Sequence, residues 1–345
     1  MSEITANATD FTPTDFDWSK DGVKQLRNAA YVVVGAALFV TNGLLCAAVA
    51  RFEAMRDTKE YLVIGGLAFA DAISGLATAF AGAFRLYITA YGLAAQPVSR
   101  RFCLLTPPIF IWNISDVLQC FMLLAQSVDR LLLVALPLYH MGLGTTYSYA
   151  LVGSVCAVTL AQAVYFFASN FIPERSGRPV EKLVCQTVHA YPRDEHAVRK
   201  TARLIAALGS IAVYAAVILL HKHRIDKAKE GKGADVQRKL EVQKKLTRTI
   251  GVSCLCTFVF YGIPQITSIV GLYVATVKAA YGLFNSYVWL IGCLNPLANI
   301  FIYTRKQREV KMAVGALLKG KSMPPSLHLW KEATSVQPVS TSQRK

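Results

Sequence analysis

An acidic and a basic residue stand side by side within a strongly apolar run, Leu123-Leu124-Ala125-Gln126-Ser127-Val128-Asp129-Arg130-Leu131-Leu132-Leu133. A charged side chain within a membrane span, or at its edge, is costly unless it is paired or reached by water. Asp129-Arg130 is therefore a candidate functional site, either a switch or a neutralised pair, and its meaning depends on the apolar segments around it.

The composition is too apolar for an ordinary soluble protein, because hydrophobic residues make up 54% of the 345 residues and charged residues only 17%. A helix needs about 20 apolar residues to cross the hydrocarbon core. Runs with few or no charges predict an all-α membrane protein, a bundle of seven transmembrane helices at approximately 27–50, 60–87, 102–134, 147–171, 199–221, 247–272 and 279–303. The predicted domains are an extracellular N-terminal tail (1–26), the seven-transmembrane domain (27–304), an amphipathic helix on the inner leaflet (305–320) and a disordered cytoplasmic tail (321–345).

Lysine and arginine are more frequent in the segments that face inward if the N-terminus lies outside, which predicts that orientation. The net charge of +16 then fits the anionic cytoplasmic leaflet. Nucleic-acid binding is not expected, because the basic residues flank spans. Residues 1–27 lack the apolar core of a cleavable signal, so the first helix would act as its own signal. Asn7 begins a glycosylation sequon on the outer tail.

Polar residues recur along one face of the third predicted helix. The positions Trp112, Asp116, Gln119, Leu123, Gln126 and Arg130 are three or four residues apart, which forms one helical stripe. Polar groups on such a stripe normally face protein or water. Asp116 lies about three turns from Asp129-Arg130, at a depth that a ligand from outside could reach.

Three further polar residues lie in the first two spans. Asp71 is expected to face the bundle, because a carboxylate facing lipid is prohibitively costly. Arg85 lies about 40° around the helix from Asp71, so it either faces the same interior or extends to the outer interface. Asn42 either bonds to a neighbouring helix or is satisfied locally.

The chain has eight cysteines, and only Cys103 and Cys185 fall in segments predicted to lie outside. The outside is oxidising, which predicts a Cys103–Cys185 disulfide. The other cysteines lie within spans, where a free cysteine behaves as a small apolar residue.

Several markers follow one another along the chain: Asn42, Leu67-Ala68-x-x-Asp71, Cys103 with Cys185, Asp129-Arg130-Leu131 with Pro137-Leu138-x-His140, Pro264, and Asn295-Pro296-Leu297-Ala298-Asn299. In this order they resemble the rhodopsin-like family of G-protein-coupled receptors, over roughly residues 28–320. Gly65-Gly66 before the second-helix motif, and Tyr261-Gly262-Ile263-Pro264, are similar to nematode serpentine chemoreceptors, especially the SRSX class.

The chain departs from the rhodopsin-like pattern at several switch positions. Leu131, Gly262 and Asn299 stand where the family has Tyr, Trp and Tyr. The fourth predicted helix has no Trp and the fifth has no Pro, although Tyr214 can match the family's inward-facing Tyr. These departures put the details of activation in doubt, but not the fold.

The resemblance implies a chemosensory receptor for a small molecule or peptide, which changes conformation on ligand binding and activates a heterotrimeric G protein. It implies a G-protein switch at Asp129, Arg130, Tyr214, Asn295, Pro296 and Asn299. It also implies a polar core that could hold a sodium ion near Asp71, formed by Asn42, Asp71, Gln119 and Asn295. The serines and threonines of the C-terminal tail are either phosphorylation sites, whose negative charge would recruit arrestin, or part of an inert solvated segment. The expected location is the plasma membrane, with a sensory neuron as the candidate cell.

The expected ligand pocket lies among Arg85, Trp112, Asn113, Asp116, Arg203, Tyr261, Asn285 and Trp289. Asp116 either pairs with Arg203 or holds a cationic ligand group, while the basic residues near the outer end leave an anionic ligand open. The aromatic residues either form pocket walls or are plain packing. Asp116→Asn, tested with cationic and anionic ligands, separates these alternatives.

Other classes of function fit the sequence less well. A non-signalling partner or decoy receptor would explain the departures at Gly262 and Asn299. A transporter or channel predicts broken helices or inverted repeats, and neither is visible. An enzyme is not expected, because no nucleophile–base set or metal cluster appears on either aqueous face.

Overall fold

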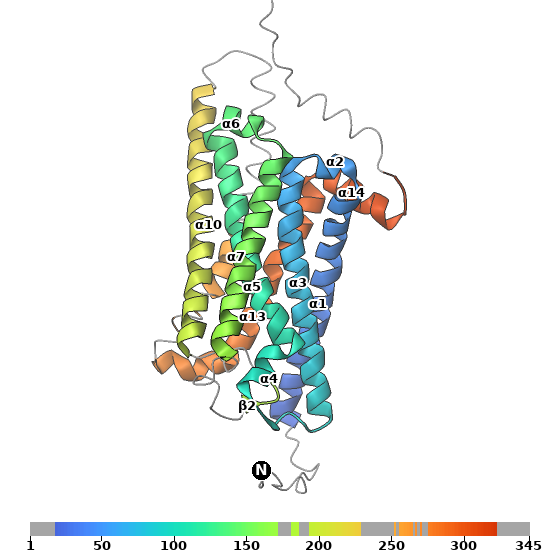
Figure 1. Ribbon diagram of the computed structural model, residues 1–345, viewed down its shortest axis with the longest axis vertical. Helices are drawn as coiled ribbons and strands as arrows, with labels where there is room; N and C mark the ends of the chain where they lie inside the picture. Colours follow the sequence, from blue (N-terminus) through green and yellow to red (C-terminus); the bar gives the residue numbers. More distant parts are fainter. Residues whose placement is uncertain are drawn as a thin grey trace, which may run out of the picture.

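The computed structural model is a bundle of long helices (Figure 1). It describes residues 18–171, 181–185, 193–228, 252, 255–264, 266–267, 270 and 275–322. The long helices are α1 (Trp18–Arg51), α3 (Lys59–Ala90), α5 (Pro107–Ala135), α7 (Thr145–Phe171), α10 (Arg193–Ala228) and α13 (Ala275–Lys306). Shorter elements connect or flank them: α2 (Glu53–Arg56), β1 (Pro97–Val98), α4 (Arg100–Leu105), α6 (Pro137–Gly142), β2 (Glu181–Lys182), the π-helix η2 (Phe258–Gly262) and α14 (Arg308–Leu318).

The predicted all-α membrane fold is confirmed. Within the described ranges, five helices are long and apolar enough to cross a membrane: parts of α1, α3, α5, α7 and α10. The seventh predicted span corresponds to α13, whereas the sixth is described only in parts, chiefly 255–264. In the bundle α3 packs between α1 and α5, and α5 also contacts α7 and α10. This places the polar stripe of α5 among its neighbours.

Several helices differ in extent from the sequence expectation. The largest extension is that of α10, which runs over Arg193–Ala228 where 199–221 was expected. The first helix begins at Trp18, inside the segment assigned to the N-terminal tail, because loss of hydropathy marks the membrane edge but does not end a helix. The third predicted helix, 102–134, is divided into α4 and α5 at Thr106. Pro107 and Pro108 follow, and the residue before a proline is disfavoured in the helical region. The proline pair was the sequence signal for this break.

Pro264 lies within the sixth predicted helix, where a proline favours a kink. Immediately before it, Phe258–Gly262 form the π-helix η2. A proline removes one backbone donor, and a π-helical turn is a local way to accommodate the changed ladder. Pro296, by contrast, lies inside the continuous helix α13.

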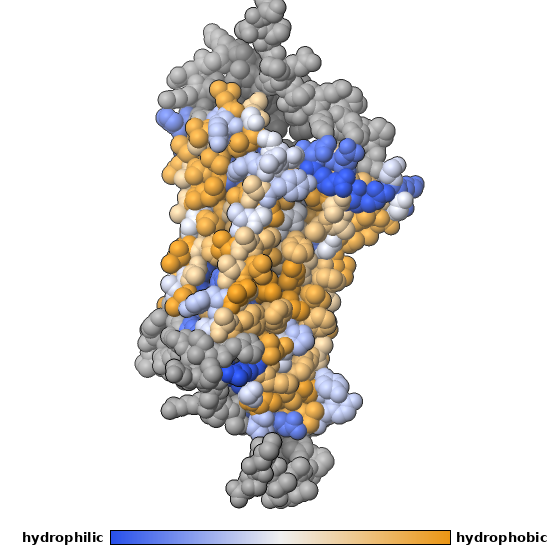
Figure 2. All heavy atoms as spheres, in the orientation of Figure 1, coloured by the Kyte–Doolittle hydropathy of each residue, from blue (hydrophilic) through white to orange (hydrophobic). Residues whose placement is uncertain are grey.

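The two ends of the bundle differ in their chemistry. At one end, called the disulfide end, β1 pairs antiparallel with β2 beside α4. The opposite end, called the Arg130 end, holds α2 and α14 side by side and α6 next to the end of α10 (Figure 1). Figure 2 shows a broad hydrophobic surface between the ends and hydrophilic residues over α2 and α14. This banding fits a chain that crosses a membrane.

The amphipathic helix expected at 305–320 is α14, which begins after Gln307. Its buried residues Val310, Ala313 and Ala316 pack into one cluster with Leu45 and Tyr303 of the bundle. The apolar face of α14 therefore contacts protein at the Arg130 end.

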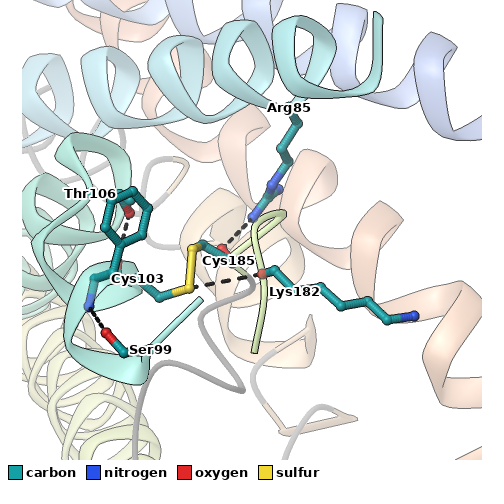
Figure 3. The surroundings of a disulfide bond; sticks show 7 residues. Arg85, Ser99, Cys103, Thr106, Lys182 and Cys185 are labelled. Atoms are coloured by element: carbon teal, nitrogen blue, oxygen red, sulfur yellow. Dashed lines mark hydrogen bonds between the residues drawn. A yellow bond between two sulfur atoms is a disulfide. The ribbon is translucent and has the colours of Figure 1, made fainter. Parts of the chain in front are cut away.

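The Cys103–Cys185 disulfide is present (Figure 3). It joins α4 to the segment after β2, and Arg85 Nη2 of α3 donates to the carbonyl of Cys185 at 3.5 Å. Of the two alternatives for Arg85, the structure has the interior one, since its guanidinium also lies 5.5 Å from the Trp112 ring.

Cys103→Ser is expected to destabilise the protein by about 2–5 kcal/mol, because the disulfide closes a long loop, one of 82 residues. The temperature at which the detergent-solubilised protein unfolds measures the loss. The double variant Cys103→Ser/Cys185→Ser should match the single variant. A double variant that is clearly less stable than the single one would contradict a loss due to the bond alone.

Candidate functional site

Asp129 and Arg130 lie at the C-terminal part of α5, at the Arg130 end, and both side chains are almost fully buried. Arg130 Nε is 3.5 Å from Asp129 Oδ2, an ion pair too long for a hydrogen bond. Neither Nε nor Nη1 of Arg130 forms a hydrogen bond. Arg130 is therefore held mainly by charge.

His140 of α6 is a second partner of Asp129 that the site prediction did not include. Its Nε2 lies 3.1 Å from Asp129 Oδ1, and the ring is completely buried. Because an ionised carboxylate can only accept, Nε2 carries the proton in this contact. Lys59 donates to the backbone carbonyls of His140 and Leu143, which fixes α6 against the start of α3. The signal was His140 itself, three residues after Pro137.

His140→Ala is expected to lower receptor stability by about 1–3 kcal/mol, because Asp129 Oδ1 loses its donor inside a buried site. Thermal half-inactivation of detergent-solubilised receptor measures the effect. His140→Asn should recover part of the loss, since an amide can also donate. His223→Ala, which removes an exposed histidine on α10, is the matched control. Equal stability of the His140→Ala and His223→Ala variants would refute the role of this contact.

The polar stripe of α5 is buried throughout, as its spacing predicted. Gln119 Nε2 donates to Asp71 Oδ1 of α3 at 2.6 Å. Nearer the Arg130 end, Gln126 Nε2 donates to the Tyr303 hydroxyl of α13 at 2.9 Å. The stripe therefore connects α5 to α3 at one level and to α13 at another. Tyr303 was missed, although it lies one turn after Asn299 on the same helix.

Other residues of the predicted switch and polar core are also buried. Thr257 Oγ1 donates to Asn295 Oδ1 at 3.0 Å, which joins the helical turn before η2 to α13. Asn42 Nδ2 donates to the Leu38 carbonyl of its own helix, so the local alternative describes this contact. Pro296, Asn299 and Tyr214 are buried on α13 and α10.

A charged cluster lies nearer the disulfide end, where α10 faces α5. Arg203 Nη1 is 2.6 Å from Asp116 Oδ2, so the structure contains the pair that was one of two alternatives for Asp116. Arg199 Nη2 is 3.6 Å from the same oxygen and donates to the backbone carbonyls of Trp112 and Asn113. The structure thus adds Arg199 to the expected set. The sequence signal for Arg199 was its position four residues before Arg203, which places both side chains on the same face of a helix.

Arg203 also connects this cluster to η2. Its guanidinium lies close enough to Tyr261 to interact electrostatically with it, and the Tyr261 hydroxyl lies 2.7 Å from Cys120 Sγ of α5. A change in the position of Arg203 would therefore alter the contacts among three elements, α5, α10 and η2. Trp112 Nε1 donates to Thr78 Oγ1 at 3.4 Å, so this aromatic residue also bridges α5 and α3.

The structure brings Arg85, Trp112, Asn113, Asp116, Arg203 and Tyr261 of the expected pocket into the interior of one half of the bundle. Asn285 and Trp289 lie on α13, but their side chains are outside the described residues. Asn7, the tail phosphorylation sites beyond Ser322 and the predicted disordered tail also lie outside them.

Comparison with protein families identifies the chain. The family model of the serpentine type 7TM GPCR chemoreceptor Srsx matches residues 33–318, which includes every helix described above except the start of α1. No curated protein matches the sequence. The SRSX-like resemblance that the motifs indicated is confirmed: the chain belongs to the Srsx family of serpentine seven-transmembrane chemoreceptors.

Proposed function

We propose that this receptor binds a small ligand from the extracellular side and responds by activating a heterotrimeric G protein. The observation that carries the proposal is the buried Asp129–Arg130 pair, which lies at the opposite end of the bundle from the disulfide. A buried charge held by one ion pair and few hydrogen bonds suits a switch, because two arrangements of similar energy are available to it. No enzymatic activity is part of the proposal.

The proposed orientation has the N-terminus and the disulfide end outside and the Arg130 end inside, in the plasma membrane. The oxidised cysteine pair and the excess of basic residues in the other segments support it. A sensory neuron is the proposed cell. Arrestin is a further proposed partner, recruited through phosphorylated serine and threonine residues of the C-terminal tail.

The proposed mechanism begins at the Asp116–Arg203 pair. A ligand that changes this pair also changes the contact of Arg203 with Tyr261, and hence the helical segment before Pro264. Movement of that segment would alter the Thr257–Asn295 contact with α13. At the inner end Arg130 leaves Asp129, and a helix of the G protein occupies the opened space. Each step is a shift between packings that exist before the ligand binds.

Sodium remains part of the proposal. Asp71 supplies a carboxylate that is 2% exposed, and its hydrogen bond to Gln119 places a second side-chain oxygen in the same polar region. Hard cations prefer such oxygen ligands. A bound sodium ion would add positive charge beside Asp71, and Asn42 and Asn295 are the other residues proposed to surround it.

The test is nucleotide exchange on a promiscuous G protein, measured during a screen of candidate ligands. We expect at least one ligand to stimulate exchange with the natural receptor and not with Arg130→Ala at equal surface expression. If ligands bind and neither receptor stimulates exchange, the proposal fails. That result would favour a decoy receptor, in which Leu131, Gly262 and Asn299 have weakened the switch.

A further inference from the structure

The charged cluster between α5 and α10 carries more basic than acidic groups. Two arginines, Arg203 and Arg199, approach one carboxylate oxygen, Asp116 Oδ2, at 2.6 and 3.6 Å. Lys200 follows Arg199 directly and is also buried. If Glu195, one turn before Arg199, is counted with the cluster, three basic side chains of α10 still face two acids. This buried cluster therefore carries a net positive charge within the membrane bundle.

Two buried donors beside this cluster have no acceptor. The Asn113 amide, on a residue 2% exposed, forms no hydrogen bond through either its nitrogen or its oxygen. Arg203 Nε is likewise buried without a hydrogen bond, although Nη1 of the same guanidinium binds Asp116. A buried donor that has no acceptor is unfavourable. An anion that replaces Asp116 here would supply the acceptor that the Asn113 amide lacks.

We propose that this cluster, Asn113, Asp116, Arg199 and Arg203, is the subsite for the carboxylate of a small organic acid, with Asp116 occupying the place of that carboxylate in the free receptor. The inference rests on the receptor function proposed above and names the ligand class. A guanidinium binds a carboxylate through two parallel N–H groups, so the ligand would replace Asp116 at Nη1 of Arg203 and use the neighbouring Nη2 as well. The Asn113 amide supplies a further donor.

A cationic ligand fits the same residues less well. To reach Asp116 it would have to replace Arg203 at 2.6 Å and then remain close to Arg199. Like charges brought together at a desolvated site are strongly unfavourable. An acid replaces Asp116 without adding a positive charge. The aromatic rings of Phe166, 5.9 Å from the Arg199 guanidinium carbon, and Trp112 offer an apolar environment for the rest of the molecule.

Displacement of Asp116 also explains how the ligand could act. Arg203 lies beside Tyr261 of η2 and interacts with it electrostatically while it pairs with Asp116 of α5. When the ligand carboxylate takes over Arg203, the direct tie between α5 and α10 through Asp116 is lost. Arg203 and Tyr261 of η2 can then move together without a constraint from Asp116 of α5.

The experiment uses purified full-length receptor in lipid nanodiscs without a G protein, and measures its apparent Tm. The probes are benzoate, benzylamine, benzamide and benzyl alcohol, each at 10 mM with equal total salt. We expect benzoate alone to raise the Tm, by about 2–4 °C. Asp116→Asn removes the competing carboxylate and should lower the benzoate concentration for half of the shift at least 10-fold.

Arg203→Lys keeps the charge but loses the two-pronged geometry, so it should raise that concentration at least 10-fold. Lys222→Ala, an exposed basic residue on the same helix, is the control and should behave like the natural receptor. The inference is overturned if benzylamine stabilises the receptor and Asp116→Asn removes that effect. It is also overturned if benzoate stabilises neither the natural receptor nor Asp116→Asn, or stabilises Arg203→Lys equally. If Arg203→Lys does not fold, Asp116→Asn still decides between the two ligand classes. It should strengthen stabilisation by benzoate if the ligand is an acid, and abolish stabilisation by benzylamine if the ligand is a cation.

The result is independent of signalling. Arg130→Ala should retain the benzoate shift, because Arg130 lies at the other end of α5. A retained shift without nucleotide exchange in the natural receptor would refute the proposed G-protein function and leave the carboxylate subsite in place.

Discussion

Replacing Arg130 with alanine is expected to reduce ligand-stimulated nucleotide exchange to background while most of the receptor still reaches the cell surface. The Arg130 side chain is 3% exposed, and in its ion pair with Asp129 the nitrogen and oxygen are 3.5 Å apart. A group that is buried and weakly bound in this state can gain new partners in another state. Alanine cannot form these new contacts, because it has no polar side-chain group that could bind a G protein.

The folded state should survive this substitution because Asp129 keeps a second partner. Removing one member of a buried ion pair costs about 3–5 kcal/mol when the remaining charge is left alone. Here His140 Nε2 still lies 3.1 Å from Asp129 Oδ1, so the cost should be smaller. Surface staining of tagged receptor separates this effect from the loss of signalling.

The matched control for Arg130→Ala is Arg305→Ala. Arg305 is an exposed basic residue at the end of α13, and its guanidinium stacks on Phe301 of the same helix. If a general loss of positive charge at the inner end were responsible, both variants would lose exchange equally. Full activity of Arg130→Ala at equal surface level would rule out the switch proposed for this pair.

The sequence predicted the parts of the fold and site that depend on periodicity and on the cost of burying charge. The spacing of the α5 stripe placed Asp116, Gln119 and Gln126 on one buried face, and the structure has each of them bonded to, or paired with, another helix. The disulfide followed from which cysteines lie outside the spans. These arguments use properties of single helices and of the membrane.

Contacts between helices were harder to predict because they depend on rotation and depth, which a single helix does not define. The pairing of Asp129 with His140 requires α6 to fold back under α5, and the chain turn at Pro137 gives no direction for that. The Gln126–Tyr303 contact likewise depends on the relative depth of α5 and α13. The break between α4 and α5 is different, because the proline pair that begins at Pro107 marks it locally in the sequence.

A second large effect is expected where α1 and α3 touch. An ideal Cβ at Gly75 would lie 2.6 Å from the backbone nitrogen of Phe39 and 2.8 Å from the carbonyl oxygen of Gly35. Both are backbone atoms of α1, so neither can rotate away. Small residues allow membrane helices to approach this closely, and dispersion contacts then hold the pair.

Gly75→Ala should therefore destabilise the receptor by about 1–3 kcal/mol, and Gly75→Leu should remove nearly all of it from the cell surface because α1 must separate from α3. Surface staining and thermal half-inactivation in detergent measure both variants. Gly153 on α7 is the matched control, since its Cβ would meet no atom within 4 Å. Gly153→Ala should be neutral or slightly stabilising, because alanine favours a helix by about 1 kcal/mol over glycine. If Gly75→Leu and Gly153→Leu reach the surface in equal amounts, close backbone contact does not hold these helices together, and the packing of α1 would have to depend on its larger side chains.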